Sequence, residues 1–113
     1  MSKDSAEWAA VVRAVVAAIP AGQVLSYAGV ARRAGRPRHA RLVARILAES
    51  SGMGLPWHRV LRADGRPGFA EGSPGWREQL QRLRSEGVEV RAGRVRMPRA
   101  VDSLDAALWG PPP

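Results

Sequence analysis

The fold is decided by residues 26–49, which read SYAGVARRAGRPRHARLVARILAE. Ser26 is a suitable N-cap for a short helix from Tyr27 to Ala34, which the following glycine ends. Pro37 opens a second helix, from about Arg38 to Glu49. Two short helices joined by a tight turn that contains glycine predict a helix-turn-helix.

The flanking segments predict a supporting helix on one side and a helix with a β-hairpin on the other. A helix from Asp4 or Ser5 to about Ala18 has an apolar stripe. A later helix, which Pro74 begins, covers Trp76 to Ser85, and two alternating runs around Ala92-Gly93 predict a hairpin over 88–97. The residues of the apolar stripe are Trp8, Val11, Val12, Val15 and Ile19. The sequence therefore predicts a single domain, residues 1–113, that is mostly α with a small β-hairpin and is of the winged helix-turn-helix type.

Two short segments complete the expected secondary structure. Trp57 to Leu61 is expected to be extended, and Leu104 to Trp109 to form a last helical turn. Of the four tryptophans, Trp8, Trp76 and Trp109 are expected in the core.

Charge is distributed unevenly along the chain, whose formal net charge is +8. Seven arginines and no acidic residue lie between Trp8 and Ala48, whereas eight of the ten acidic residues lie at Glu49 or later. The excess of arginine over lysine is explained as well by a GC-rich genome as by phosphate binding, so the argument depends on the asymmetry. One strongly positive half predicts a polyanionic partner such as DNA.

The composition also excludes several classes of protein. Cysteine is absent, which excludes disulfides, thiolate metal sites and cysteine nucleophiles. The two histidines, His39 and His58, have no zinc-binding spacing, so we expect no metal and no cofactor. No apolar run approaches the roughly 18 residues of a membrane span, and the first residues lack the layout of a signal peptide. We therefore expect a cytoplasmic monomer without a membrane partner.

A second informative segment is LPWHRV, residues 55–60. Taken alone, Trp57 is interpreted as a core aromatic residue and His58 as its hydrogen-bonded polar neighbour. The segment resembles the active-site signature Pro-Cys-His-Arg-Val of the O6-alkylguanine-DNA alkyltransferase family, with Trp57 at the cysteine position.

Further stretches resemble the same family, in the same order, over roughly Trp8 to Val90. They are the Ile-Pro-x-Gly-x-Val turn at 19–24, the Ser-Tyr pair at 26–27, the Ala-Arg-x-Val of the recognition helix at 40–43 and the Glu-Gly-hydrophobic stretch at 86–88. Replacement of the cysteine by tryptophan is typical of the alkyltransferase-like proteins of this family, and the tail at 108–111 is similar to theirs. These proteins keep the DNA-binding domain and cannot accept an alkyl group.

The resemblance implies that the chain binds double-stranded DNA containing O6-alkylguanine and flips the damaged nucleotide into a pocket. Tyr27 would drive the rotation, and Arg41 would enter the gap from a helix in the minor groove. Trp57 would form an aromatic wall of the pocket, and its carbonyl and that of Val60 would accept hydrogen bonds from guanine. The other residues implied at the DNA are Ser26, Arg38, Ala40, Ala44 and Arg45, and those implied at the lesion pocket are Leu47 and Phe69.

The resemblance also assigns the remnants of the active site. His58, Arg59 and Glu86 occupy the positions that support the thiolate in the enzymes. Without a nucleophile we expect them to be structural, tying the loop to the last helix. The predicted protein is not an enzyme; it binds the lesion and hands it to nucleotide excision repair proteins. Four acidic positions form a hypothetical contact for such a partner: Glu71, Glu78, Asp102 and Asp105.

The chain departs from the family pattern at several positions near the pocket. Ala28 and Ala44 stand where the family has glycine, and Ser50 or Ser51 stands in place of an asparagine. The loop between the recognition helix and Trp57 is one residue shorter. Each change bears on the shape of the pocket.

Two other functions remain open from the sequence. The first is a winged-helix regulator that prefers a particular DNA sequence and is indifferent to alkylation. The second is an enzyme that uses His58 and Glu86 as an acid and base pair in a reaction such as base excision.

Overall fold

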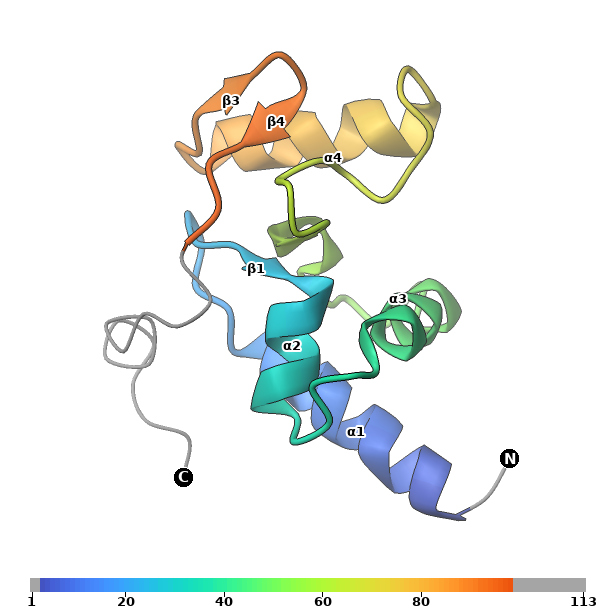
Figure 1. Ribbon diagram of the computed structural model, residues 1–113. Helices are drawn as coiled ribbons and strands as arrows, with labels where there is room; N and C mark the ends of the chain where they lie inside the picture. Colours follow the sequence, from blue (N-terminus) through green and yellow to red (C-terminus); the bar gives the residue numbers. More distant parts are fainter. Residues whose placement is uncertain (1–2, 99–113) are drawn as a thin grey trace.

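The computed structural model describes residues 3–98 and contains four α-helices and two small sheets within that range (Figure 1). The elements in order are α1 (Lys3–Ala17), β1 (Leu25–Ser26), α2 (Tyr27–Arg33), α3 (Ala40–Glu49), a 3₁₀ turn η1 (Trp57–Arg59), β2 (Val60–Leu61), α4 (Pro74–Ser85), β3 (Val90–Arg91) and β4 (Arg94–Val95). The predicted fold class, mostly α with a small hairpin, is confirmed. The last turn expected at 104–109, with Trp109, lies outside the described residues.

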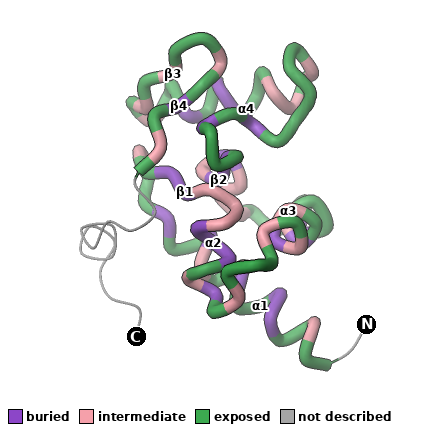
Figure 2. The backbone as a smooth tube through the Cα atoms, viewed as in Figure 1, coloured by how far each residue is buried: buried purple, intermediate pink, exposed green. Residues whose placement is uncertain are grey.

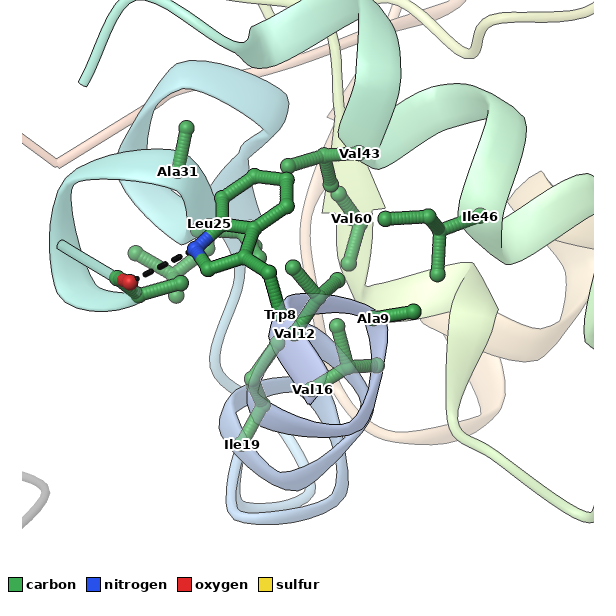
Figure 3. Packing of buried hydrophobic residues seen from close by; sticks show 12 residues of the cluster. Trp8, Ala9, Val12, Val16, Ile19, Leu25, Ala31, Val43, Ile46 and Val60 are labelled. Carbon is green, nitrogen blue, oxygen red and sulfur yellow. Dashed lines mark hydrogen bonds between the residues drawn. The ribbon is translucent and has the colours of Figure 1, made fainter. Parts of the chain in front are cut away.

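Helices α1, α2 and α3 pack around the larger apolar cluster (Figure 3). Trp8 is buried there, and its Nε1 donates a hydrogen bond of 2.8 Å to the carbonyl of Ala34 at the end of α2. Val11 was expected in the stripe of α1 but is 45% exposed, and Val16 is buried in its place. Positions 8, 12 and 16 lie on one face of α1, and the side chain at position 11 points away from that face.

The starts of α2 and α3 differ in how they are capped. The Ser26 hydroxyl accepts from the Gly29 amide at 2.9 Å, as expected of an N-cap. Helix α3 begins at Ala40, two residues later than predicted, because the His39 amide closes a turn onto the carbonyl of Arg36 at 3.0 Å. The tight connection between the two helices is thereby one turn longer.

A short parallel pair of strands, β1 and β2, connects the segment before the helix-turn-helix to the segment after it. Leu25 pairs with Val60 and Ser26 with Leu61. The extended conformation predicted for 57–61 is therefore wrong for its first half: Trp57–Arg59 is a 3₁₀ turn, and only the last two residues form a strand. A parallel pair needs a crossover connection, which α2 and α3 supply.

Helix α4 and the hairpin form the upper part of the molecule in Figure 1. Ser73 caps α4 by accepting from the Trp76 amide at 3.3 Å, with Pro74 in the first turn as predicted. Ala92 and Gly93 turn the hairpin with φ values of 53° and 72°, the positive pair that a tight I′ turn requires. A second cluster of four buried residues comprises Val24, Leu61, Leu83 and Val95. Figure 2 shows buried segments, in purple, in this upper part as well as around α1–α3.

Neither a membrane-spanning helix nor a metal-binding cluster occurs among the described residues. Within residues 3–98, no helix combines the length and apolarity needed to cross a bilayer. The same stretch contains no group of three histidine, cysteine or acidic side chains placed to hold a metal ion.

Candidate nucleic-acid interface

One face of the helix-turn-helix carries unpaired positive charge. Arg38, Arg41 and Arg45 are exposed, and none of their side chains forms a hydrogen bond or ion pair with any residue between 3 and 98. Arg41 and Arg45 are one turn apart on α3 and so point the same way. We call these three residues the basic face; unpaired guanidinium groups are suited to phosphate oxygens.

Arg36, in the turn just before them, has a different role. Its Nη2 atom donates to both carboxylate oxygens of Asp4, at 3.0 and 2.9 Å, and its guanidinium lies 5.1 Å from the ring centroid of Trp8. Arg36 therefore ties α1 to the turn between α2 and α3. This pairing removes one arginine from the charge available to a polyanion.

A cavity of about 770 Å³ lies beside α3. Its walls combine apolar side chains with a few polar groups, and they come from both halves of the chain. The lining residues are Tyr27, Ala44, Leu47, Ala48, Ser50, Ser51, Gly52, Gly54, Leu55, Trp57, Gly68, Phe69, Gly75, Glu78 and Arg82. The structure thus brings together four of the five side chains that the sequence assigned to a lesion pocket: Tyr27, Leu47, Trp57 and Phe69.

Val60, the fifth, does not line this cavity. Its side chain is 1% exposed and packs in the larger apolar cluster, because alternation along β2 turns it inward. Its carbonyl, which the sequence assigned to guanine, already accepts a hydrogen bond of 2.8 Å from Nε2 of Gln79. Val60 is a core residue.

The aromatic side chains of the cavity meet edge to face. The rings of Trp57 and Phe69 are 5.7 Å apart between centroids, with an interplanar angle of 77°. Phe69 is 44% exposed, which places it at the rim. A methyl group on Gly75 would lie 2.6 Å from Cδ1 of Phe69, so the ring can rest on α4 only because position 75 has no side chain.

Tyr27 reaches the cavity from the first residue of α2. Burial raises the pKa of its hydroxyl group, which therefore stays a neutral donor. A methyl group on Gly68 would come within 2.6 Å of the hydroxyl oxygen, so this glycine admits the tyrosine tip. The hydroxyl forms no hydrogen bond with the described part of the chain, which leaves it available to a ligand.

The small residues of α3 and the serines that follow it also have defined places. Ala40 and Ala44 are half-buried, and Ala44 is part of the cavity wall. Ser50 is buried, and its hydroxyl donates to the carbonyl of Ile46 at 2.6 Å at the end of α3. Ser50 therefore stabilises the helix end and Ser51 stays exposed at the cavity.

Two residues of the cavity wall, Glu78 and Arg82, were missed. They form an ion pair of 2.7 Å one turn apart on α4, and the Arg82 guanidinium lies 5.4 Å from the ring centroid of Trp57. Their i,i+4 spacing predicts the pair but not the surface it faces. Glu78, which the sequence placed on a distant partner surface, borders the cavity; Glu71 is exposed, and Asp102 and Asp105 lie outside the described residues.

Glu86 accepts hydrogen bonds from two segments of the chain, the 3₁₀ turn and the turn after α1. Its carboxylate lies 2.9 Å from Nε2 of His58, 3.0 Å from Nε of Arg59 and 3.2 Å from the Gly22 amide. Arg59 also donates to the carbonyl of Ile19 at 2.7 Å. The hydrogen bond from Arg59, followed by those from His58 and Gly22, lowers the pKa of Glu86 to about 2 despite its burial. This Glu86 network joins the turn after α1, the 3₁₀ turn that carries Trp57, and the end of α4.

Comparison with known proteins places this arrangement among DNA-binding domains. The family model described as the 6-O-methylguanine DNA methyltransferase, DNA binding domain, matches residues 7–88. The chain is 44% identical over 77 residues to a DNA base-flipping protein of Escherichia coli, and the match covers 67% of this chain and 58% of that protein. It is 37% identical over 76 residues to Alkyltransferase-like protein 1 of Schizosaccharomyces pombe, covering 66% of this chain and 70% of that protein.

A solved structure is similar over nearly its whole length. The crystal structure of S. pombe Atl1 in complex with damaged DNA containing O6-carboxymethylguanine superposes with a TM-score of 0.71 at 32% sequence identity. The superposition covers 87% of this chain and 93% of that one.

Proposed function

Because the chain belongs to the family of 6-O-methylguanine DNA methyltransferase DNA-binding domains, and within it to the alkyltransferase-like proteins, we propose that it recognises O6-alkylguanine in duplex DNA without repairing it. The observation that carries the proposal is that Trp57 forms a wall of the cavity next to the basic face. By the resemblance of its segment, Trp57 stands at the position of the family's cysteine.

The basic face binds the DNA backbone first. Arg38 and Arg45 contact phosphates, and the short side chains of Ala40 and Ala44 let α3 approach the minor groove. Because these contacts read no base, the affinity they supply is independent of the lesion and decreases with salt.

Flipping of the damaged nucleotide follows. Tyr27 pushes the nucleotide out of the stack, and the unpaired Arg41 enters the gap that it leaves. The cavity volume of about 770 Å³ is in the usual range for small-molecule sites, roughly 300–1,000 Å³, which supports a flipped base as its occupant. Stacking of the base on Trp57 contributes about 1–3 kcal/mol.

No alkyl transfer follows, because the sequence contains no cysteine. An indole is not a competent alkyl acceptor at neutral pH, and the His58–Glu86 pair has no thiol beside it to activate. The Glu86 network then has a structural role: it holds the turn that presents Trp57.

The test is binding to two duplexes of the same sequence, one with O6-methylguanine and one with guanine, at a fixed salt concentration. We expect selective binding to the methylated duplex, with protein and DNA masses unchanged afterwards. Arg41→Ala and Tyr27→Ala should reduce the selectivity, whereas Arg45→Ala should weaken binding to both duplexes equally.

Equal affinity of the wild-type protein for both duplexes contradicts the proposal. A preference for one DNA sequence without a response to alkylation would favour a winged-helix regulator instead. A released or altered base would favour excision chemistry at His58 and Glu86.

We also propose that the bound monomer presents the lesion to nucleotide excision repair proteins, since binding alone leaves the adduct in place. The protein should accelerate incision of a duplex with O6-methylguanine by a purified excision endonuclease. Trp57→Ala, which removes the aromatic wall, should abolish the acceleration. An incision rate that the protein leaves unchanged would contradict this step.

A further inference from the structure

The α4 wall of the cavity contains a charged pair that base stacking does not require. Glu78 and Arg82 are 2.7 Å apart, and each side chain is 50% exposed. A half-exposed ion pair of this kind contributes little to stability, because water competes with it. The pair can therefore be rearranged by a ligand with small effect on the fold.

Arg82 lies against the aromatic wall of the cavity. Its guanidinium is 5.4 Å from the centroid of Trp57, the ring on which the base would stack. A guanidinium has five N–H donors, and the contact with Glu78 occupies only one nitrogen atom, Nη2. The remaining donors form no hydrogen bond with another described residue, so they can bind a second acceptor.

The same pair lies between the cavity and a second, more open depression along α4. This depression is lined by Pro74, Arg77, Glu78, Gln81, Arg82 and Ser85. Glu78 and Arg82 border both spaces, so a substituent longer than a methyl group could pass beside them toward solvent.

We propose that Arg82 is a specificity-determining residue that favours guanine adducts whose O6 substituent ends in a carboxylate. The proposal rests on the lesion recognition proposed above. A carboxylate accepts two parallel hydrogen bonds from a guanidinium, and such charge-assisted bonds are stronger than neutral ones. Glu78 lowers the affinity for such adducts, because its carboxylate competes for Arg82 and repels the carboxylate of the adduct. An O6-methyl group has no hydrogen-bond acceptor and therefore does not bind Arg82.

The test compares the full chain on three duplexes of one sequence, containing guanine, O6-methylguanine or O6-carboxymethylguanine, at fixed ionic strength. Arg82→Gln should lower the affinity for the carboxymethyl duplex roughly tenfold and change that for the methyl duplex less than about twofold. Glu78→Gln should raise the carboxymethyl affinity by about threefold. Arg84→Gln is the matched control: it removes the same charge from α4 at a residue that lines neither space, and it should leave the ratio of the two affinities unchanged.

Two results overturn the proposal. The first is an equal loss of affinity for all three duplexes in Arg82→Gln, which would assign Arg82 to a phosphate. The second is a ratio of carboxymethyl to methyl affinity that is the same in Arg82→Gln and Glu78→Gln as in the wild-type protein. Failure of the proposed function itself is distinguishable, since the wild-type protein would then bind guanine and O6-methylguanine duplexes alike. Both substituted residues are half exposed, so the variants should fold, which thermal unfolding of each can verify.

Discussion

The lower and upper halves of the protein in Figure 1 are held together by different forces. In the lower half, α1–α3 enclose an apolar cluster of twelve buried residues. In the upper half, α4 and the hairpin share a cluster of only four, and the end of α4 is tied to the rest by the Glu86 network. The half that carries the basic face is thus stabilised by hydrophobic packing, and the other half depends more on polar contacts.

The cavity takes its walls from both halves. Tyr27 and Leu47 belong to the lower half, whereas Phe69, Glu78 and Arg82 belong to the upper. Substitutions in the upper half should therefore change lesion recognition while the basic face is unaffected. The following variants test this difference, in decreasing order of expected effect.

Gly65→Ala should be the most damaging change. Gly65 has φ +87°, and a methyl group there would collide with the backbone carbonyl of Val95 in β4, which cannot move aside. We expect a loss of about 3–5 kcal/mol in the free energy of unfolding, measured with urea, from strain and collision together. Gly35→Ala in the lower half is the control: it has φ +88° but no atom within 4 Å, so it should lose only about 1–2 kcal/mol. Similar losses for both variants would show that the hairpin does not depend on this contact.

Glu86→Ala should destabilise the protein by about 3 kcal/mol, because it leaves the largely buried Arg59 without its partner. Urea unfolding measures the loss. Glu89→Ala, which breaks an exposed pair with Arg91, should cost less than about 0.5 kcal/mol. If the two losses are equal, the Glu86 network does not stabilise the upper half.

Acid should weaken the same network. The pKa of Glu86 is about 2 in the folded protein, below its ordinary value of 4.5, so the folded state favours the ionised form. Its stabilising contribution is complete above about pH 4.5 and is lost as the pH falls toward 2. The difference in melting temperature between wild type and Glu86→Gln should therefore narrow over that interval. A constant difference from pH 5 to pH 2 would contradict the assignment.

Gly75→Ala should affect recognition more than stability. The added methyl group displaces the Phe69 ring from α4, so discrimination between methylated and plain duplex should fall roughly three- to tenfold. Binding to the plain duplex should not change. Alanine is the better helix former by about 1 kcal/mol, so loss of the helix is not expected. Phe69→Ala should reproduce the result; full discrimination in both variants would remove Phe69 from the pocket.

The two helix caps should give the smallest effects. Ser26→Ala and Ser73→Ala each remove one N-cap and should cost about 1 kcal/mol in thermal or urea unfolding. The larger loss is expected for Ser26, whose hydrogen bond is 2.9 Å compared with 3.3 Å for Ser73. The reverse order would indicate that the upper half is the more sensitive to its local contacts.

Local signals predicted the helices and the hairpin well. Ser26 and Pro74 mark helix starts by capping chemistry, and the Ala92-Gly93 turn follows from the positive φ values that the hairpin needs. The start of α3 was placed too early, since a turn onto Arg36 uses the residues before Ala40. The parallel pair of β1 and β2 was missed, because each strand has two residues and its partner is 35 positions away.

The sequence predicted those residues of the candidate site that belong to a recognisable motif. Tyr27 and Trp57, which belong to the quoted motifs, both border the cavity, and so does Phe69, which lies outside those motifs. Val60 was assigned to the pocket through its carbonyl, by resemblance to the family, whereas its side chain is buried in the core and its carbonyl accepts from Gln79. No local pattern shows which way a strand of two residues faces.

The sequence alone shows that the protein has no thiol, that Trp57 precedes the His58-Arg59 pair, and that seven arginines and no acidic residue lie between Trp8 and Ala48. Chemistry of this kind depends only on which residues are present and in what order. Only the tertiary structure places Arg82 of α4 over Trp57 and brings Glu86 within hydrogen-bond distance of two separate segments, the 3₁₀ turn and the turn after α1. Those contacts join residues 25 to 64 positions apart, and only the packing of α4 over the 3₁₀ turn brings them within reach of each other.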